Sequence, residues 1–369
     1  MAAGVMLSVE CDDRILPVDR AVERVLEVTV AASGGDRRAP RAARAPALVL
    51  ACRDDAGRRA GAAAAARLQQ TLAPGELLAV TTVAASETAL VDAWFDAGSR
   101  LASAPERAAL VAFVTDGLPT RADADLAPLA LRARQLCQVG VSTAAFCIGP
   151  DSDIITPLLL AEQGGGAFHM LASPDALLPA LLAEVDDLAG VIATDSLLTV
   201  TAPPGAAVYV LGDVPHERLP TGVQIALGQL RRGEARRLYL CLALTAGGPG
   251  ALSITADVMM RAFDGEVLRA CAEQTLRPGP LTVAPSRRIR AAAARVETAA
   301  VTATALALER AGRRHQAEAM LRDALRRHAA ALDGADYAAG EALAAALAGG
   351  LRIADRNRAC LDAYQARRG

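Results

Sequence analysis

The chain has 369 residues, more than one ordinary hydrophobic core holds, so two or three domains are expected. Hydrophobic residues make up 53% of the chain and aromatic residues only 3%, a composition carried by Ala, Leu and Val that favours closely packed helices. The formal net charge is −2 and charges of both signs are interspersed, which excludes a large basic footprint for nucleic acid.

The first residues lack a charged segment followed by a long apolar run, and no later apolar run approaches the length that spans a bilayer. We therefore expect a cytoplasmic protein without a membrane span. The cysteines are odd in number and mostly set in apolar runs, which indicates buried, reduced thiols. The seven are Cys11, Cys52, Cys137, Cys147, Cys241, Cys271 and Cys360.

Residues 1–32 contain two alternating segments, 7–11 and 24–32, which predict strands with one buried face. The polar stretch 33–46, rich in Arg and Pro, predicts a linker or a long loop. The two strands have no partners nearby, so we expect them to complete a sheet formed later in the chain.

From 46 to 190 the pattern changes to strands that alternate with helices. Continuous apolar strands joined through helices predict a doubly wound, mostly parallel α/β sheet covered on both faces. The helices expected here include one that stops at Gly140 and one that starts at Ser173 and Pro174 and runs to about 188. The predicted strands lie at 47–52, 77–83, 108–115, 141–149 and 167–171, and the other helices at 57–72, at 88–102 and between the last two strands.

Residues 196–283 return to short strands separated by turns such as PPG and RRGE, which predicts an antiparallel β-sandwich. We expect the N-terminal strands to join it, so that the α/β domain is an insertion. Residues 286–369 form a helical C-terminal domain with a turn at 311–314. The hairpin at 303–328 is similar to a tetratricopeptide-type pair, but without a second copy a packing role is favoured over a peptide-binding array.

Ligands bind to such α/β sheets beyond the carboxyl ends of the strands, where neighbouring loops converge. Two acidic loops follow predicted strands here: CRDDAG at 52–57 and TDGLPT at 115–120. Both are expected at the same edge of the sheet.

These motifs resemble those of the von Willebrand factor A domain family. The run AALVAFVTDGLPT is similar to the family's apolar strand ending in Thr-Asp-Gly, and GVSTAAFCIGPDSDIITPLLLAEQGGGAFHML to the stretch that follows it in bacterial members. PALVLACRDDAG takes the place of the first strand and its Asp-x-Ser-x-Ser motif, and SETAL that of the Thr-containing loop. VQIALGQLRRGEARRLYLCLAL resembles the β-rich region of bacterial relatives of calcium-activated chloride channel proteins.

The resemblance implies a metal-binding motif that has degenerated. The family holds Mg²⁺ or Mn²⁺ with an Asp, two Ser, a Thr and a second Asp. At the corresponding positions this chain has Ala51, Arg53, Asp55, Thr88 and Asp116, with Gly117 after the last. Hard divalent ions need several oxygen ligands, so the loss of an anionic ligand and the gain of a guanidinium disfavour metal binding.

We hypothesise that Arg53 replaces the cation by pairing with Asp116, with Asp54 or Asp55 nearby. The competing interpretation leaves Arg53 pointing to solvent. A third possibility is a rebuilt Mg²⁺ or Mn²⁺ site made of Asp54, Asp55, Thr88 and Asp116. Only AASE separates the second predicted strand from Thr88, where the family has another strand and helix, so the sheet is expected to be trimmed at that edge.

No motif in the sequence predicts catalysis. A Gly-x-Ser-x-Gly motif is absent, and the four histidines, His169, His216, His315 and His328, are dispersed over the predicted domains. His169 is expected to be a packing residue, and GGG at 164–166 a helix end and turn rather than a phosphate loop. The Arg-rich helix at 313–328 is typical of a solvated face, with an acidic partner or a membrane as the alternative.

The sequence thus predicts a non-enzymatic scaffold or adaptor that binds a protein partner through the loops around Arg53 and Asp116, with no cofactor. The helical tail is expected to add a second contact surface. The alternative is a cation-dependent ligand-binding protein, and a hydrolase or transferase with an unrecognised site comes last.

Overall fold

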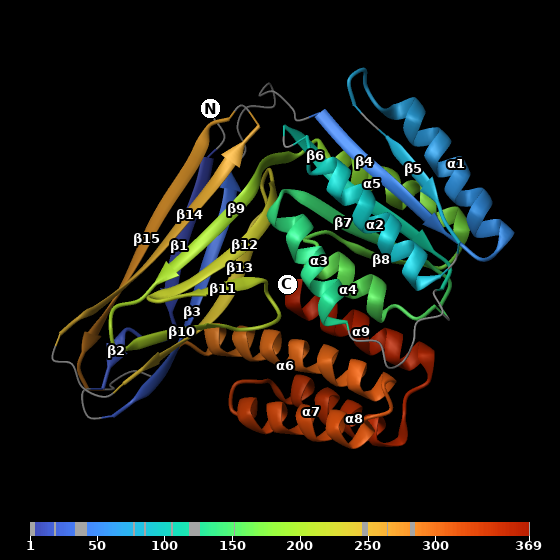
Figure 1. Ribbon diagram of the computed structural model, residues 1–369. Coiled ribbons are helices and arrows are strands. Elements are labelled where there is room, and N and C mark those ends of the chain that lie inside the picture. Colours follow the sequence, from blue (N-terminus) through green and yellow to red (C-terminus); the bar gives the residue numbers. More distant parts are fainter. Residues whose placement is uncertain are drawn as a thin grey trace.

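The computed structural model describes residues 4–17, 20–33, 43–76, 78–84, 86–104, 106–117, 126–150, 152–245, 250–263, 265–280 and 285–368. Over these residues three parts pack together: a parallel sheet covered by helices, an antiparallel sandwich and a C-terminal group of helices (Figure 1). The predicted fold class, an α/β unit inserted in a β-sandwich with a helical C-terminal region, is confirmed.

The α/β unit is built on a five-stranded parallel sheet in the order β5-β4-β6-β7-β8. Strand residues alternate between two cores, with Val49 and Val111 facing α2, α3 and α4, and Leu48 and Leu110 facing α1 and α5. Both faces are covered, which is why the strands read as continuous apolar runs. The elements are β4 (Ala43–Ala51), α1 (Asp55–Thr71), β5 (Ala79–Thr82), α2 (Glu87–Leu101), β6 (Arg107–Thr115), α3 (Ala127–Gln138), β7 (Val141–Ile148), α4 (Ile155–Gln163), β8 (Phe168–Leu171), a 3-10 helix (Pro174–Ala176) and α5 (Leu177–Leu188).

Two sheets form the sandwich, in the orders β1-β3-β13-β10 and β11-β12-β9-β14-β15-β2. Strands β1 and β3 pair with each other, and β3 also pairs with β13. The start of the chain therefore belongs to the same sheet as a strand that follows about 200 residues later in the sequence. Side chains such as Leu26, Leu240 and Ile254 fill the space between the sheets. The elements are β1 (Gly4–Cys11), β2 (Ile15–Leu16), β3 (Val22–Ser33), β9 (Val191–Thr201), β10 (Ala206–Val210), β11 (His216–Leu219), β12 (Gly222–Arg231), β13 (Ala235–Leu244), β14 (Leu252–Ala262) and β15 (Val267–Pro278).

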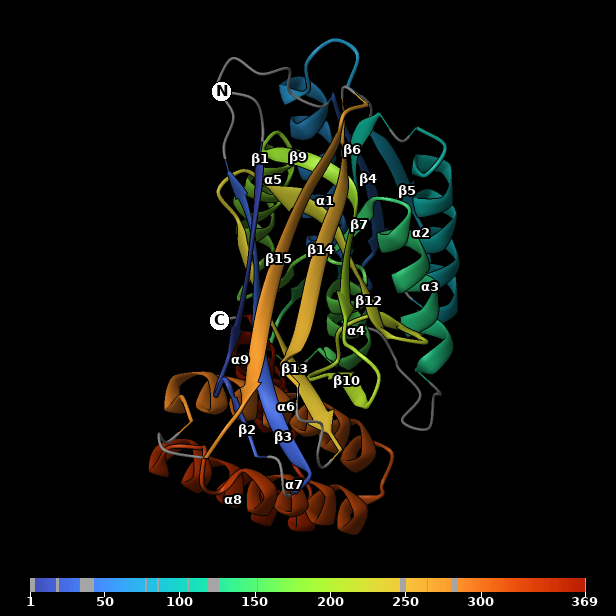
Figure 2. The ribbon, with the colours of Figure 1, turned by 90° about the vertical axis from the view of Figure 1, so that its left-hand side faces the viewer.

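The C-terminal part consists of α6 (Arg287–Arg310), α7 (Arg314–His328), α8 (Gly334–Gly349) and α9 (Ile353–Arg368). Helix α6 packs against α7 and α9, and α7 packs against α8. Leu306 and Tyr364 belong to the same apolar core as Trp94 and Phe113 of the α/β unit. Figure 2 shows α6, α7 and α8 beneath the sandwich, which α6 contacts through β3 and β13. The helices therefore brace both other parts.

Helix α6 corrects the expectation that no apolar stretch approaches the length of a membrane span. Among the helices of the described residues, it alone is long and apolar enough by length and composition, with a mean hydropathy of 1.2 over the best window and 33% of that window buried. Arg288 and Arg290 at its start pair with Glu27 and Asp12 of the sandwich, at 2.9 and 2.5 Å. Its apolar residues pack against α7 and α9.

Three further expectations need correction. Cys271 is exposed rather than buried, because it lies on the outward face of β15 at the surface of the sandwich. The side chain of Ser173 makes no capping hydrogen bond, and a 3-10 turn precedes α5. The predicted loop 33–46 is shorter, since β3 reaches Ser33 and β4 begins at Ala43; residues 34–42 lie outside the described residues. Strand β2 has only two residues and β11, with the sequence HERL, has no buried residue, so neither shows a pattern of apolar residues and neither was predicted.

Candidate interaction site at the carboxyl edge of the parallel sheet

Three neighbouring strands end together at one edge of the parallel sheet. Ala51 at the end of β4 is in register with Thr115 at the end of β6, and Thr115 with Cys147 near the end of β7. The described residues that follow these strands therefore lie side by side, as the topology of a parallel sheet requires. They are 52–54 after β4, 116–117 after β6, and 149–150 and 152–154 after β7, and we call them the loop edge. Ala51 itself is buried beneath it.

Asp116 is the central acidic residue of the loop edge. Its Oδ1 accepts a hydrogen bond from the backbone N–H of Arg53 at 2.8 Å, and its Oδ2 accepts one from the backbone N–H of Asp54 at 2.7 Å. Its side chain is 7% exposed. One carboxylate thus holds the turn after β4 against the end of β6, a charge-assisted contact that ties the two loops together.

Arg53 lies directly beside this carboxylate. Its Nε is 3.8 Å from Asp116 Oδ1, and its Nη2 donates to the backbone carbonyl of Asp116 at 3.3 Å, while 57% of the side chain stays exposed. The guanidinium passes over Gly117, where a Cβ would come within 2.7 Å of Arg53 Nη2. Gly117 also has a φ of +115°, which L side chains rarely adopt, so the backbone itself favours glycine here; a Cβ would in addition displace the exposed end of the Arg53 side chain.

The remaining predicted residues divide into two groups. Asp54 caps α1, with its Oδ1 accepting from the backbone N–H of Gly57, and Asp55 pairs with Arg58. Arg58 also donates to the backbone carbonyl of Arg53 at 2.5 Å, which fixes the turn. Thr88 is an exposed residue in the first turn of α2, and within the described residues it makes no hydrogen bond to the loop edge. The structure brings Arg53, Asp54 and Asp116 together but not Thr88.

A buried thiol lies beneath the site. Burial, assisted by the charges of Asp116 and Asp54, raises the pKa of Cys52 to about 12. Its Sγ lies 3.9 Å from the carbonyl of Val114. Burial therefore favours the protonated thiol at neutral pH.

The loop after β7 adds residues that the sequence analysis did not select. Ser152 Oγ would lie 3.3 Å from a Cβ at position 117, so this loop adjoins Gly117. Asn357 of α9 donates from Nδ2 to the carbonyls of Pro150 and Ser152, at 3.0 and 2.8 Å. The strand-end rule would have found Ser152, because it follows β7 in the sequence. Nothing in the sequence marks Asn357, which lies about 200 residues further on.

A second contact joins the helical part to this loop. Arg310 at the end of α6 pairs with Asp153 at 2.8 Å, with only 6% of the arginine side chain exposed. The other carboxylate oxygen of Asp153 accepts from the backbone N–H of Ile155 at the start of α4. Helices α6 and α9 therefore hold one of the three loops in place from below (Figure 1).

His169 and the glycines at 164–166, which the sequence analysis singled out, make packing contacts. His169 stacks on Phe146 with ring centroids 4.7 Å apart and lies 2.9 Å from Glu184. Gly164 ends α4, and a Cβ at Gly166 would meet the carbonyl oxygen of Thr143 at 1.9 Å, so this glycine allows close backbone packing. Over the described residues, no group of three or more His, Cys, Asp or Glu side chains is placed to hold a metal ion.

The arginines of α7 are largely neutralised by acidic neighbours. Arg322 pairs with Glu318 at 2.8 Å, and Arg327 pairs with Glu297 and Asp323 at 3.1 and 3.0 Å. Such exposed pairs contribute little energy, but they cancel the positive field of the helix. The solvated face expected from the sequence is consistent with these ion pairs and stays a prediction.

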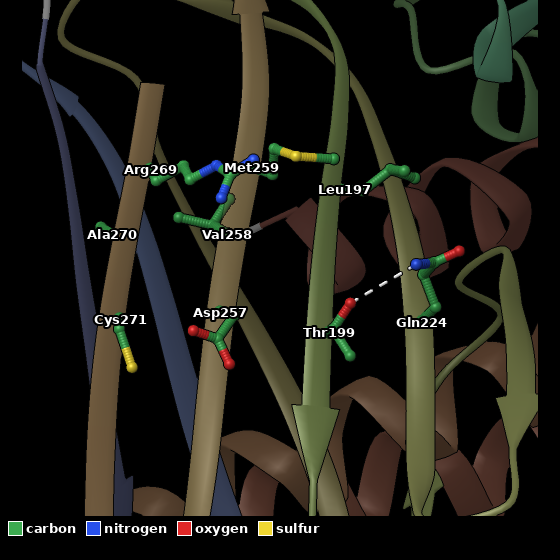
Figure 3. A pocket seen from close by; sticks show the side chains of 9 residues that line it. All are labelled: Leu197, Thr199, Gln224, Asp257, Val258, Met259, Arg269, Ala270 and Cys271. Atoms are coloured by element: carbon green, nitrogen blue, oxygen red, sulfur yellow. Dashed lines mark hydrogen bonds between the residues drawn. The ribbon is translucent and has the colours of Figure 1, made fainter. Parts of the chain in front are cut away.

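The outer face of the six-stranded sheet carries a shallow groove of about 580 Å³ (Figure 3). Asp257 of β14 and Cys271 of β15 are register partners within it. The carboxylate of Asp257 raises the pKa of the Cys271 thiol, which keeps it protonated. The groove lies on the face of the sheet and not where loops converge, although Asp257 and Arg269 line it.

Comparison with known proteins gives different results for sequence and structure. No protein-family model matches the sequence, and no curated protein matches it significantly. The structure is similar to the VWA2 paralogue of ArnB from Sulfolobus acidocaldarius, with a TM-score of 0.63 and 13% identity over 100% of both chains. It is also similar to a von Willebrand factor type A protein from Catenulispora acidiphila, with a TM-score of 0.62 and 15% identity, covering 95% of this chain and 97% of that one.

These similarities extend over all three parts of the molecule. The expected resemblance to von Willebrand factor A proteins is confirmed at the level of the fold, whereas the likeness to relatives of calcium-activated chloride channel proteins stays a prediction. The chain therefore has the fold of von Willebrand factor type A proteins, with the β-sandwich and the helical part included in the shared architecture.

Proposed function

We propose that this chain is a non-enzymatic adaptor that binds a protein partner at the loop edge without a divalent cation. The observation that carries the proposal is the environment of Asp116. Both of its carboxylate oxygens accept backbone N–H groups, and the exposed guanidinium of Arg53 lies beside it. The loop edge thus presents a guanidinium group beside a carboxylate.

The partners of the acidic side chains argue against a cation site. A divalent ion needs several oxygen ligands that point toward one position. Asp116 holds two backbone groups, Asp54 caps α1, and Asp55 pairs with Arg58. A bound metal ion would have to replace these interactions and would also lie near the guanidinium of Arg53, which repels it.

The exposed arginine suggests what the partner presents. A guanidinium offers several N–H donors in a planar fork that matches a carboxylate, and 57% of the Arg53 side chain is open to solvent. We expect an acidic side chain of the partner to bind Arg53 directly. The proposal includes a second contact surface on the helical part, which braces the loop edge through Asn357 and Arg310.

Affinity capture from the native cell with charge-reversed variants tests this function. Arg53→Glu should abolish capture of the partner. The matched variant Arg67→Glu, at an exposed position near the other end of α1, should retain it. Capture should persist in the presence of a chelator. Loss of capture in both variants, or in neither, would contradict a role for the loop edge.

The alternative function is a cation-dependent receptor that uses Asp54, Asp55, Thr88 and Asp116. Calorimetry with Mg²⁺, Mn²⁺ and Ca²⁺ separates the two. Saturable binding that disappears in Asp116→Ala, together with partner capture that a chelator abolishes, would establish the alternative and overturn the metal-free proposal.

A further inference from the structure

A pocket lies at the place where the three parts of the molecule meet, away from the loop edge. Its volume is about 380 Å³. The α/β unit contributes the end of α4 and the turn after it, the sandwich contributes β12, β13 and the connection from β10 to β11, and the helical part contributes α6 and the end of α9. Pockets at such junctions are preferred places for small-molecule binding, and this volume suits a small ligand.

Two of the three acidic side chains that line the pocket are paired with arginines of the pocket itself. Arg367 binds Glu162 through both oxygens, at 2.5 and 2.7 Å, and also donates to the carbonyl of Ala299. Arg236 pairs with Glu234 at 2.6 Å. These four charges cancel in pairs, and the buried Arg367, 6% exposed, is fixed in place.

The third acid, Asp213, is also occupied. Its carboxylate accepts from the amide of Gln163 at 2.9 Å and lies 3.3 Å from a guanidinium nitrogen of Arg134. Gln163 is fully buried. No carboxylate of the pocket's described lining residues is therefore left without a donor.

Two positive charges of the lining have no such partner. Within the described residues, Arg237 of β13 and Arg368 of α9 make no ion pair with a carboxylate. Arg368 donates to the carbonyl of Gly166 at 2.7 Å and to the hydroxyl of Tyr364, and its guanidinium carbon lies 5.2 Å from the centroid of the Tyr364 ring. Neutral contacts thus orient this guanidinium and leave its charge uncompensated.

We propose that this pocket binds a small organic molecule through an anionic phosphate or carboxylate group held by Arg237 and Arg368. The four arginines and three acids of the lining leave an excess of positive charge, and a guanidinium fork matches either oxyanion. A ligand here contacts all three parts at once. Its binding therefore stabilises the arrangement of the α/β unit, the sandwich and the helices by mass action.

Thermal unfolding and calorimetry of the full chain test the proposal, with inorganic phosphate and citrate as probes and sodium chloride at matched ionic strength as the reference. At least one probe should raise the unfolding midpoint and bind saturably. Arg237→Gln should weaken that binding about tenfold, and the double variant with Arg368→Gln should weaken it further. Arg237 is exposed and makes no ion pair within the described residues, so the single variant is expected to fold.

A matched control excludes binding at the loop edge. Arg53→Gln removes the exposed guanidinium of the loop edge and should leave phosphate and citrate binding unchanged, so this result is independent of the proposed adaptor function. A response to phosphate alone would assign a phosphate-bearing ligand, and a response to citrate alone a carboxylate-bearing one. Absence of binding by both probes, or equal binding by wild type and the double variant, would overturn the proposal.

Discussion

The two ends of strand β4 carry arginine–carboxylate pairs of opposite character. At its start, Arg44 binds both oxygens of Glu76, at 2.7 and 2.8 Å, and the two side chains are 13% and 11% exposed. Just after its end, the guanidinium of Arg53 approaches the carboxylate of Asp116 only to 3.8 Å, and the arginine side chain remains 57% exposed. We call the amino end of the sheet, where the arginine and the carboxylate are in direct contact and buried, the closed end. The carboxyl end, where they are further apart and the arginine is exposed, is the open end.

The difference follows from the topology of a parallel sheet. Each helix returns the chain to the amino end of the sheet. There Arg44 also pairs with Asp186 of α5 at 2.9 Å, which holds that helix against the start of β4. At the carboxyl end, Asp116 accepts the backbone N–H groups of Arg53 and Asp54, and the guanidinium of Arg53 stays largely exposed; under the proposed function it binds the partner there. The amino end should therefore determine stability, and the carboxyl end binding.

The largest expected effect on stability is at the closed end. Arg44→Met leaves Glu76 with an uncompensated, largely buried charge and should reduce the free energy of unfolding by about 2–3 kcal/mol. The matched variant at the open end, Arg53→Met, should cost no more than about 1 kcal/mol, because exposed pairs contribute little. Urea unfolding measures both values, and equal losses would remove the distinction between the two ends.

An intermediate effect is expected for the acid of the open end. Asp116→Ala leaves two backbone N–H groups, of Arg53 and Asp54, without acceptors, and should cost about 1–3 kcal/mol. Asp116→Asn keeps one carbonyl acceptor and should cost less. The same urea titration compares them, and an alanine variant as stable as wild type would show that these hydrogen bonds do not hold the loops.

The smallest effect concerns pH. Burial alone would raise the pKa of Glu76, but hydrogen bonds from Arg44 and from backbone N–H groups outweigh it and hold that pKa below its usual 4.5. A lowered pKa means that the stabilisation is complete above about pH 4.5 and is lost as the pH falls through the folded-state value.

The stability difference between wild type and Glu76→Gln should therefore shrink between about pH 6 and about pH 3. Unfolding free energies measured across this range check the sign. A difference that grows on acidification would mean that Glu76 is stabilised in its protonated form instead.

Sequence patterns were sufficient for much of the fold and for the centre of the site. Apolar runs that alternate with helical periods predicted the parallel sheet, and the rule on strand ends placed Arg53 and Asp116 at one edge. Thr88 was chosen through the family resemblance, and in this shortened connection it lies apart in α2. The exposure of Cys271 depended on which face of the sandwich β15 turns outward.

The sequence by itself determined the order and type of the long elements, the joining of the N-terminal strands to the sandwich, and the proximity of Arg53 to Asp116. These features follow from hydrophobic periodicity, which is local, and from the rules of chain connection, which do not depend on the packing of particular side chains. Only the tertiary structure decided that Asn357 and Arg310 hold the loop after β7 and that Arg237 and Arg368 share a pocket. Those contacts join residues more than 100 positions apart, and their geometry depends on how three separately patterned parts pack.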